Sequence, residues 1–218
     1  MENSGDEKVN PTDTFENRTE YCAANYTVMQ NYDLAFDIGS NLGGFSCAFN
    51  KNFKRIVAVE AHPGTFKKCV TNLNNFQNIK VLNRAASNTT DQYINIFSHE
   101  NGDSGSATCI NNSHTSSELK NSSEVLTISY SSLVEKYGIP DYMKIDIEGS
   151  EYDFLMNKDL SGVQFLSLEL HMGLLTGSQR KDLMKHLSKY FSVFKHKKGI
   201  PRVCHDEFAL INWNLHIK

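Results

Sequence analysis

A short apolar run that breaks into a glycine-rich turn constrains the fold of this chain more than any other feature. Leu34–Phe36 is apolar, and the segment Phe36–Ser46 that follows carries glycine at positions 39, 43 and 44. Gly39 and Gly43 have no Cβ, so the backbone N–H groups of the turn can approach a ligand closely. A strand that ends in such a turn and is followed by a helix is typical of the first βα unit of an α/β fold.

The residues beside these glycines indicate the kind of ligand. A dinucleotide-binding fingerprint has glycine at its second motif position, where this chain has Asn41. Asp37 lies two residues before the first glycine, and its carboxylate would repel a pyrophosphate. The same carboxylate suits a ligand with a cationic amino-acid end. The turn therefore favours S-adenosylmethionine over NAD, and weighs against a dinucleotide oxidoreductase.

A second carboxylate follows at the distance that a βαβ unit requires. Arg55–Glu60 is a buried-strand run that ends in an acid about twenty residues after Gly39. A carboxylate in this place can accept hydrogen bonds from both ribose hydroxyls of an adenosine-containing ligand. The alternative is that Glu60 is an ordinary surface residue after a strand.

Composition limits the possible classes of protein. With 218 residues, 39% hydrophobic and 22% charged, the chain suits one soluble α/β domain. The net charge of −3 argues against nonspecific binding to nucleic acid. No apolar run has the length of a membrane span, the start is too polar for a signal peptide, and the five scattered cysteines indicate free thiols. We therefore expect a cytoplasmic protein with no membrane span and no nucleic-acid partner.

The order of the remaining elements predicts a Rossmann-like, doubly wound, mostly parallel sheet with helices on both faces. Residues 1–30 are expected to form a polar, partly helical extension, and residues 31–218 a single domain. Two final extended runs without a helix between them predict an antiparallel last strand. The predicted strands are Leu34–Ile38, Ile56–Glu60, Ile79–Leu82, Gln92–Phe97 (outside the main sheet), Val125–Ser129, Tyr142–Glu148, Phe165–His171, Phe191–Phe194 and Phe208–Ile211.

Five residues with possible roles share one edge of this predicted sheet. Asp37, Glu60, Ala86, Asp146 and His171 all fall at the carboxyl ends of predicted strands. Ligands of open α/β sheets bind at these ends, near the point where the strand order reverses. This common location is stronger evidence for a site than any single motif.

Four motifs make the chain similar to the FkbM-type class I methyltransferases. They are Asp37–Gly43, Val59–Pro63, Arg84–Ser87 and, most specific to the family, Lys144–Glu151. The resemblance covers most of the chain. It implies a seven-stranded Rossmann-like sheet, S-adenosylmethionine as methyl donor, and hydroxyl groups as acceptors, commonly on sugars.

Carried over by matched position, the resemblance also implies a set of cofactor-binding residues. Glu60 should hold the ribose, and Asp146 should lie closest to the sulfonium. The full set is Asp37, Gly39, Ser40, Asn41, Gly43, Glu60, Ala61, His62, Arg84, Ala86, Ser87 and Asp146.

Methyl transfer to a sugar hydroxyl needs a group that takes the hydroxyl proton. His171 is the first candidate, because a histidine of ordinary pKa near 6.5 accepts a proton at neutral pH; the alternative is a strand-end histidine bonded to a backbone carbonyl. Asp146 and Glu148 are a second option, since like charge can raise a carboxylate's pKa; otherwise Glu148 caps a helix and Asp146 orients the cofactor. The sequence Asp146–Gly149 replaces the Asn/Asp-Pro-Pro-Tyr motif of many amino-group methylases, which favours oxygen as the acceptor atom.

Two further points stay open at the level of sequence. Asp146, Glu169 and His171 could form a hard-metal site, because Glu169 and His171 share one face of a strand, but no metal is assigned. The polar segment Asn101–Ser123 favours a sugar or glycan acceptor, for example a deoxyhexose such as rhamnose. The alternatives are a non-sugar small molecule, a lipid or a peptide hydroxyl, or a module that binds a nucleoside without catalysis.

Overall fold

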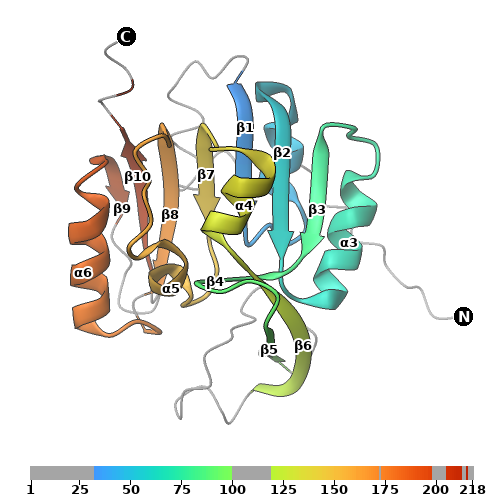
Figure 1. The fold of residues 1–218 in the computed structure, drawn as a ribbon. Coiled ribbons are helices and arrows are strands. Elements are labelled where there is room, and N and C mark those ends of the chain that lie inside the picture. The colour runs from blue at the N-terminus through green and yellow to red at the C-terminus, as the bar shows by residue number, and fades with distance from the viewer. Residues whose placement is uncertain (1–31, 100–118, 172, 198–204, 213–214, 216–218) are drawn as a thin grey trace, which may run out of the picture.

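A seven-stranded sheet forms the centre of the protein (Figure 1). The computed structural model describes residues 32–99, 119–171, 173–197, 205–212 and 215. The strands lie in the order β3-β2-β1-β7-β8-β10-β9. Their bounds are β1 Tyr32–Ile38, β2 Phe53–Glu60, β3 Ile79–Asn83, β7 Tyr142–Ile145, β8 Phe165–His171, β9 Ser192–Lys197 and β10 His205–Ile211.

The direction of the strands agrees with the prediction. The strands β3, β2, β1, β7 and β8 are parallel to one another, whereas β10 is antiparallel to both β8 and β9. The strand order reverses at β1, which has β2 on one side and β7 on the other. A crevice for ligands is expected at this switch point.

Helices cover both faces of the sheet because successive residues of a strand point to opposite sides. Phe36 of β1 belongs to a buried cluster with Leu133 of α4 and Leu183 of α6. Its neighbour Ala35 belongs to a second cluster with Phe45 of α2. The helices are α2 Gly44–Ala48, α3 Pro63–Leu73, α4 Tyr130–Tyr137, α5 Glu151–Leu155 and α6 Gly177–Leu187, with a 3₁₀ turn at Asn50–Asn52. The predicted doubly wound fold is confirmed.

A second, smaller sheet lies at the carboxyl ends of the parallel strands (Figure 1). It consists of β4 (Ala85–Ser87), β6 (Leu119–Ser129) and β5 (Tyr93–His99), in the order β4-β6-β5. The predicted strand outside the main winding is therefore present as β5. The sequence did not indicate β4, and it indicated only the end of β6.

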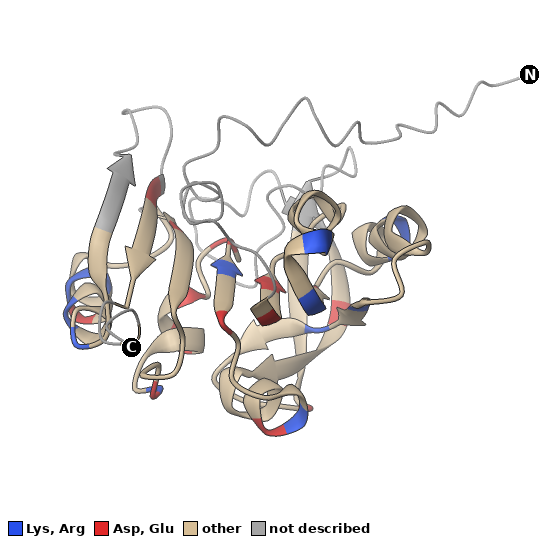
Figure 2. Ribbon diagram, turned by 90° about the horizontal axis from the view of Figure 1, so that it is seen from above, with Lys and Arg blue, Asp and Glu red and all other residues tan. Residues whose placement is uncertain are grey.

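Charged residues are spread over the molecule. Figure 2 shows Lys and Arg dispersed among helices and strands, with Asp and Glu between them. Among the described residues, no helix is long and apolar enough to cross a membrane. The predicted extension over residues 1–30 and much of the polar segment 101–123 lie outside the described residues.

Candidate functional site

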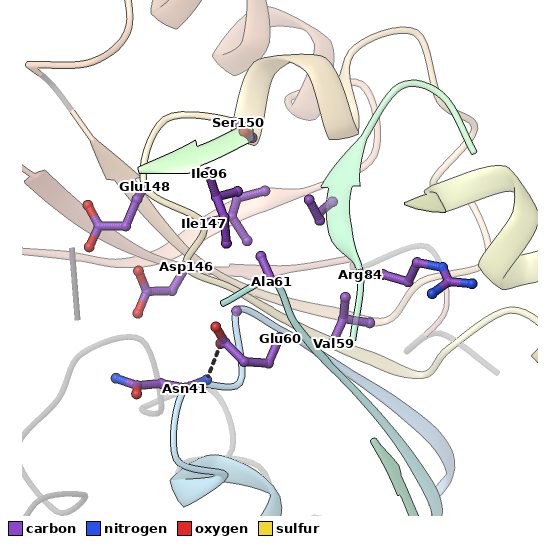
Figure 3. A pocket seen from close by; sticks show the side chains of 13 residues that line it. Asn41, Val59, Glu60, Ala61, Arg84, Ile96, Asp146, Ile147, Glu148 and Ser150 are labelled. Carbon is purple, nitrogen blue, oxygen red and sulfur yellow. Dashed lines mark hydrogen bonds between the residues drawn. The ribbon is translucent and has the colours of Figure 1, made fainter. Parts of the chain in front are cut away.

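A pocket lies between the carboxyl ends of the parallel strands and the small sheet (Figure 3). Its empty space, including the open mouth, is about 630 Å³. Its walls come from the turn after β1, the end of β2, the strands β4 and β5, and the turn after β7. The lining residues are Gly39, Asn41, Val59, Glu60, Ala61, Arg84, Ala85, Ala86, Ile96, Asp146, Ile147, Glu148 and Ser150.

The turn after β1 depends on glycine for its shape. Gly39 has a φ of +77°, and a Cβ at this position would lie 1.7 Å from the carbonyl oxygen of Asp146. This close approach brings the turn after β1 against the turn after β7. Gly43 has a different role, because a Cβ there would lie 2.7 Å from a side-chain carbon of Leu73 in α3. Gly39 therefore shapes the pocket, and Gly43 allows the packing of α3.

The backbone N–H groups of this turn are already bonded inside the protein. Those of Gly39 and Ser40 donate to the carbonyl oxygen of Val59, at 2.9 and 3.0 Å. The N–H of Asn41 donates to Oε2 of Glu60 at 2.9 Å. A phosphate group needs such N–H donors, and here that of Asn41 is bonded to the carboxylate of Glu60 instead. This arrangement supports the exclusion of a dinucleotide.

Glu60 lies at the end of β2 with its carboxylate fixed by the backbone (Figure 3). Its two oxygens accept from the N–H groups of Asn41 and His62, the latter at 2.8 Å. Burial raises the pKa of Glu60, and these two hydrogen bonds act in the opposite direction. Because an ionised carboxylate has about four acceptor positions, Glu60 can still accept from ligand hydroxyls in the pocket.

Asp37 does not line the pocket. Its side chain is fully buried, and it accepts a hydrogen bond of 2.6 Å from Oγ of Ser46. Nζ of Lys144 lies 3.8 Å from Oδ1 of Asp37 and 3.5 Å from Oδ2 of Asp146. The same Nζ donates to the carbonyl oxygen of Gly39 at 2.6 Å. Asp37 is thus an acidic partner of Lys144, and the ammonium group of Lys144 links the ends of β1 and β7.

Lys144 was not among the residues predicted to be functional. The available signal was a lysine inside an otherwise apolar strand, since a buried ammonium group requires acidic partners.

Four other predicted cofactor residues also lie away from the pocket lining. Oγ of Ser40 is 3.6 Å from Sγ of Cys69, and His62 caps α3 by accepting from the N–H of Thr65. The remaining two are Gly43 and Ser87. The seven predicted residues that do line the pocket are Gly39, Asn41, Glu60, Ala61, Arg84, Ala86 and Asp146. The lining residues to which the sequence assigned no role are Val59, Ile96, Ile147 and Ser150.

Four carboxylates surround the imidazole of His171 at the edge of this pocket. Nδ1 lies 2.6 Å from Oε1 of Glu151, which is fully buried. Nε2 lies 3.1 Å from Oε2 of Glu148, 3.7 Å from Oε1 of Glu169 and 3.9 Å from Oδ1 of Asp146. The structure therefore brings together the three residues predicted to be catalytic, His171, Asp146 and Glu148.

This environment changes the protonation of His171. Burial alone would lower its pKa, but the hydrogen bonds to Glu148 and Glu151 outweigh burial and raise the pKa to about 11. A pKa in this range means that the imidazole carries its proton at neutral pH. His171 was predicted to be a base because a histidine ordinarily has a pKa near 6.5. Its environment raises that pKa, so this reason does not hold.

The backbone supports the placement of Glu148. This residue has a φ of +49°, which is uncommon for a residue with a side chain, and Gly149 follows with a φ of +103°. Strained backbone of this kind persists where the surrounding structure fixes it, often at functional sites. It turns Glu148 into the pocket beside Asp146 (Figure 3).

Comparison with known proteins identifies relatives of this architecture. The model of the Methyltransferase FkbM domain matches residues 37–197. No curated protein matches the chain.

Among solved structures, TrmK of M. capricolum in complex with S-adenosyl-homocysteine is similar, with a TM-score of 0.52 and 9% identity over 88% of this chain and 67% of that one. A protein of the NADB-Rossmann superfamily from Streptococcus agalactiae has a TM-score of 0.52 and 14% identity over 93% and 71% of the two chains. Methyltransferase FkbM from Methylobacillus flagellatus KT has a TM-score of 0.51 and 14% identity. That match covers 85% of this chain and 45% of the other, so this chain spans less than half of that relative.

These structural likenesses, at low identity, show a shared Rossmann-like fold. The family match covers most of the chain and includes the end of β1 and the strands β2 and β7, whose ends contribute to the pocket. It confirms the resemblance found in the four motifs. The chain belongs to the FkbM methyltransferase family.

Proposed function

We propose that this protein transfers a methyl group from S-adenosylmethionine to a hydroxyl group of a sugar or glycan. The observation that carries the proposal is the pocket itself. It presents the carboxylates of Glu60, Asp146 and Glu148 at the ends of parallel strands, while the N–H groups of its turn are bonded internally. Such a pocket suits a nucleoside with a cationic sulfonium and ammonium, and it disfavours a phosphate.

The lining residues give each part of the cofactor a place. Glu60 accepts from the ribose hydroxyls, and Gly39 and Asn41 contact the methionine part. Apolar contacts from Ala61 and Ile96 suit the adenine ring, with Ala86 and Arg84 on the same side. Asp146 faces the sulfonium, in agreement with its position after β7.

The same geometry supports an oxygen acceptor. In the reaction, the hydroxyl oxygen attacks the methyl carbon, the carbon–sulfur bond breaks, and S-adenosylhomocysteine leaves. The hydroxyl proton must go to a base. Glu148 is placed for this step because its carboxylate lines the pocket, with Oε2 at 3.1 Å from Nε2 of His171. Asp146 completes the proposed catalytic set.

The choice of a sugar acceptor rests on the family resemblance and on the polar composition of residues 101–123. A small-molecule, lipid or peptide hydroxyl is the alternative acceptor, and a non-catalytic nucleoside-binding module is the alternative class. An acceptor screen with S-adenosylmethionine labelled in its methyl group separates them. We expect label on a sugar such as rhamnose or on a glycan, with Glu148→Gln at least about tenfold slower.

The exposed carboxylate of Asp153 in α5 provides the matched control, and Asp153→Asn should retain the activity of the wild type. Label found only on non-sugar hydroxyls would contradict the acceptor class. Cofactor binding with no transfer to any acceptor would favour the binding module.

A further inference from the structure

We propose that Asp146, Glu169 and His171 bind a divalent metal ion of the Mn²⁺ type at the edge of the pocket. One carboxylate oxygen from each acid and one ring nitrogen of the histidine all lie within 4.8 Å of one another. Ligands on opposite sides of a metal with bonds of about 2.1 Å are about 4.2 Å apart. Small inward shifts of the side chains would therefore complete the three contacts.

The sheet itself brings the three residues together. Glu169 and His171 are two positions apart on β8, so both side chains lie on the same face of the strand. Asp146 follows directly after β7, which is parallel to β8 and pairs Ile145 with Leu168. Asp146 is thus level with Glu169 on the neighbouring strand. The arrangement rests on the register of two buried strands.

The orientation of His171 is fixed in the way that metal-binding histidines require. Nδ1 is bonded to the buried Oε1 of Glu151 at 2.6 Å, which directs Nε2 towards Asp146 and Glu169. A carboxylate on the second ring nitrogen is the usual partner of a histidine that binds a metal.

Charge gives an independent reason for a cation. Four carboxylates lie within 4 Å of the His171 ring nitrogens, and Lys144 contributes one ammonium near Asp146. Lys144 also compensates Asp37. Among the described residues, the buried Oε2 of Glu151 has no hydrogen-bond partner. Buried carboxylates depend on nearby positive charge, and a divalent cation that takes the place of the Nε2 proton of His171 would add one unit of it.

The donor set selects the kind of metal. One imidazole and two carboxylates form a mixed nitrogen and oxygen set without sulfur, which suits Mn²⁺ better than Mg²⁺, an ion that favours oxygen ligands and water. Three protein ligands leave positions for water and, if the proposed function holds, for the acceptor hydroxyl. A metal at Nε2 would also replace the contact of that nitrogen with Glu148, leaving this carboxylate to face the acceptor.

Titration of the full chain with Mn²⁺, followed by the electron paramagnetic resonance signal of the free ion, tests the site without any activity measurement. We expect one site per chain. Glu169→Gln and Asp146→Asn should each weaken binding about tenfold or more, as should Glu151→Gln through the orientation of His171. Asp153→Asn should bind like the wild type.

Circular dichroism of each variant ensures that only folded samples are compared. A folded wild type without stoichiometric Mn²⁺ binding, or equal binding by Glu169→Gln and Asp153→Asn, would overturn the inference. Calorimetry with S-adenosylhomocysteine in the presence of a chelator keeps the two proposals apart. Cofactor binding without a manganese site would refute the metal site alone, and a manganese site without cofactor binding would refute the proposed function alone.

Discussion

At the scale of single residues, the pocket depends on a missing side chain as much as on those present. Gly39 combines a φ of +77° with an approach to the backbone of Asp146 that leaves no room for a Cβ. We predict that Gly39→Ala lowers the free energy of unfolding by about 2 kcal/mol or more, because the residue must adopt a strained φ and displace the neighbouring turn. Urea denaturation measures this change.

Gly177 supplies the control for this substitution. It is the first residue of α6, and the nearest atom to a Cβ there is the end of the Arg180 side chain at 3.7 Å. Gly177→Ala should therefore leave stability unchanged within about 0.5 kcal/mol or raise it slightly. Similar destabilisation by both substitutions would show that the approach of Gly39 to Asp146 is not what the turn requires.

The sequence predicted which residues reach the site better than it predicted what they do. Glu60 and Asp146 line the pocket. The sequence could predict this because an apolar run shows where a buried strand ends. The position of Asp37 outside the lining depends on Lys144, whose ammonium group reaches it from the next strand. The protonation of His171 likewise depends on Glu148 and Glu151, which meet it only in the folded chain.

At the scale of secondary structure, the buried parallel strands were the most predictable elements. β1 and β2 contain largely apolar runs, such as Ile56–Val59, because both faces of the sheet are covered, whereas β8 alternates apolar and polar residues. The three-residue strand β4 is too short for such a run, and the first half of β6 is polar, so the local sequence does not mark either as a strand.

The small sheet is predicted to contribute to ligand binding through one residue of β5. Ile96 is 3% exposed, packs in a cluster with Ala85 and Val125, and lines the pocket. Ile96→Ala should weaken binding of S-adenosylhomocysteine several-fold, because it removes apolar contact on the proposed adenine side. Isothermal calorimetry gives the affinity.

Tyr93 lies on the same strand but is 68% exposed, so Tyr93→Ala is the matched control and should bind like the wild type. If Ile96→Ala also kept the affinity of the wild type, the small sheet would not form part of the cofactor site.

At the scale of the whole molecule, the fold places one crevice at the point where the strand order reverses. The ends of β1, β2 and β7 and the strand β5 meet there, although they are far apart in the sequence (Figure 1). Family membership establishes the class of enzyme, and the acids around the crevice agree with a cationic cofactor. The central claim is therefore that this crevice binds S-adenosylmethionine through Glu60.

The most direct test is calorimetric titration of the wild type and of Glu60→Ala with S-adenosylhomocysteine and, separately, with NAD. The account predicts that the wild type binds S-adenosylhomocysteine and not NAD. Loss of hydrogen bonds from the ribose to a buried carboxylate should weaken binding by Glu60→Ala about tenfold or more. Binding of NAD by the wild type, or no binding of S-adenosylhomocysteine by a folded sample, would contradict it.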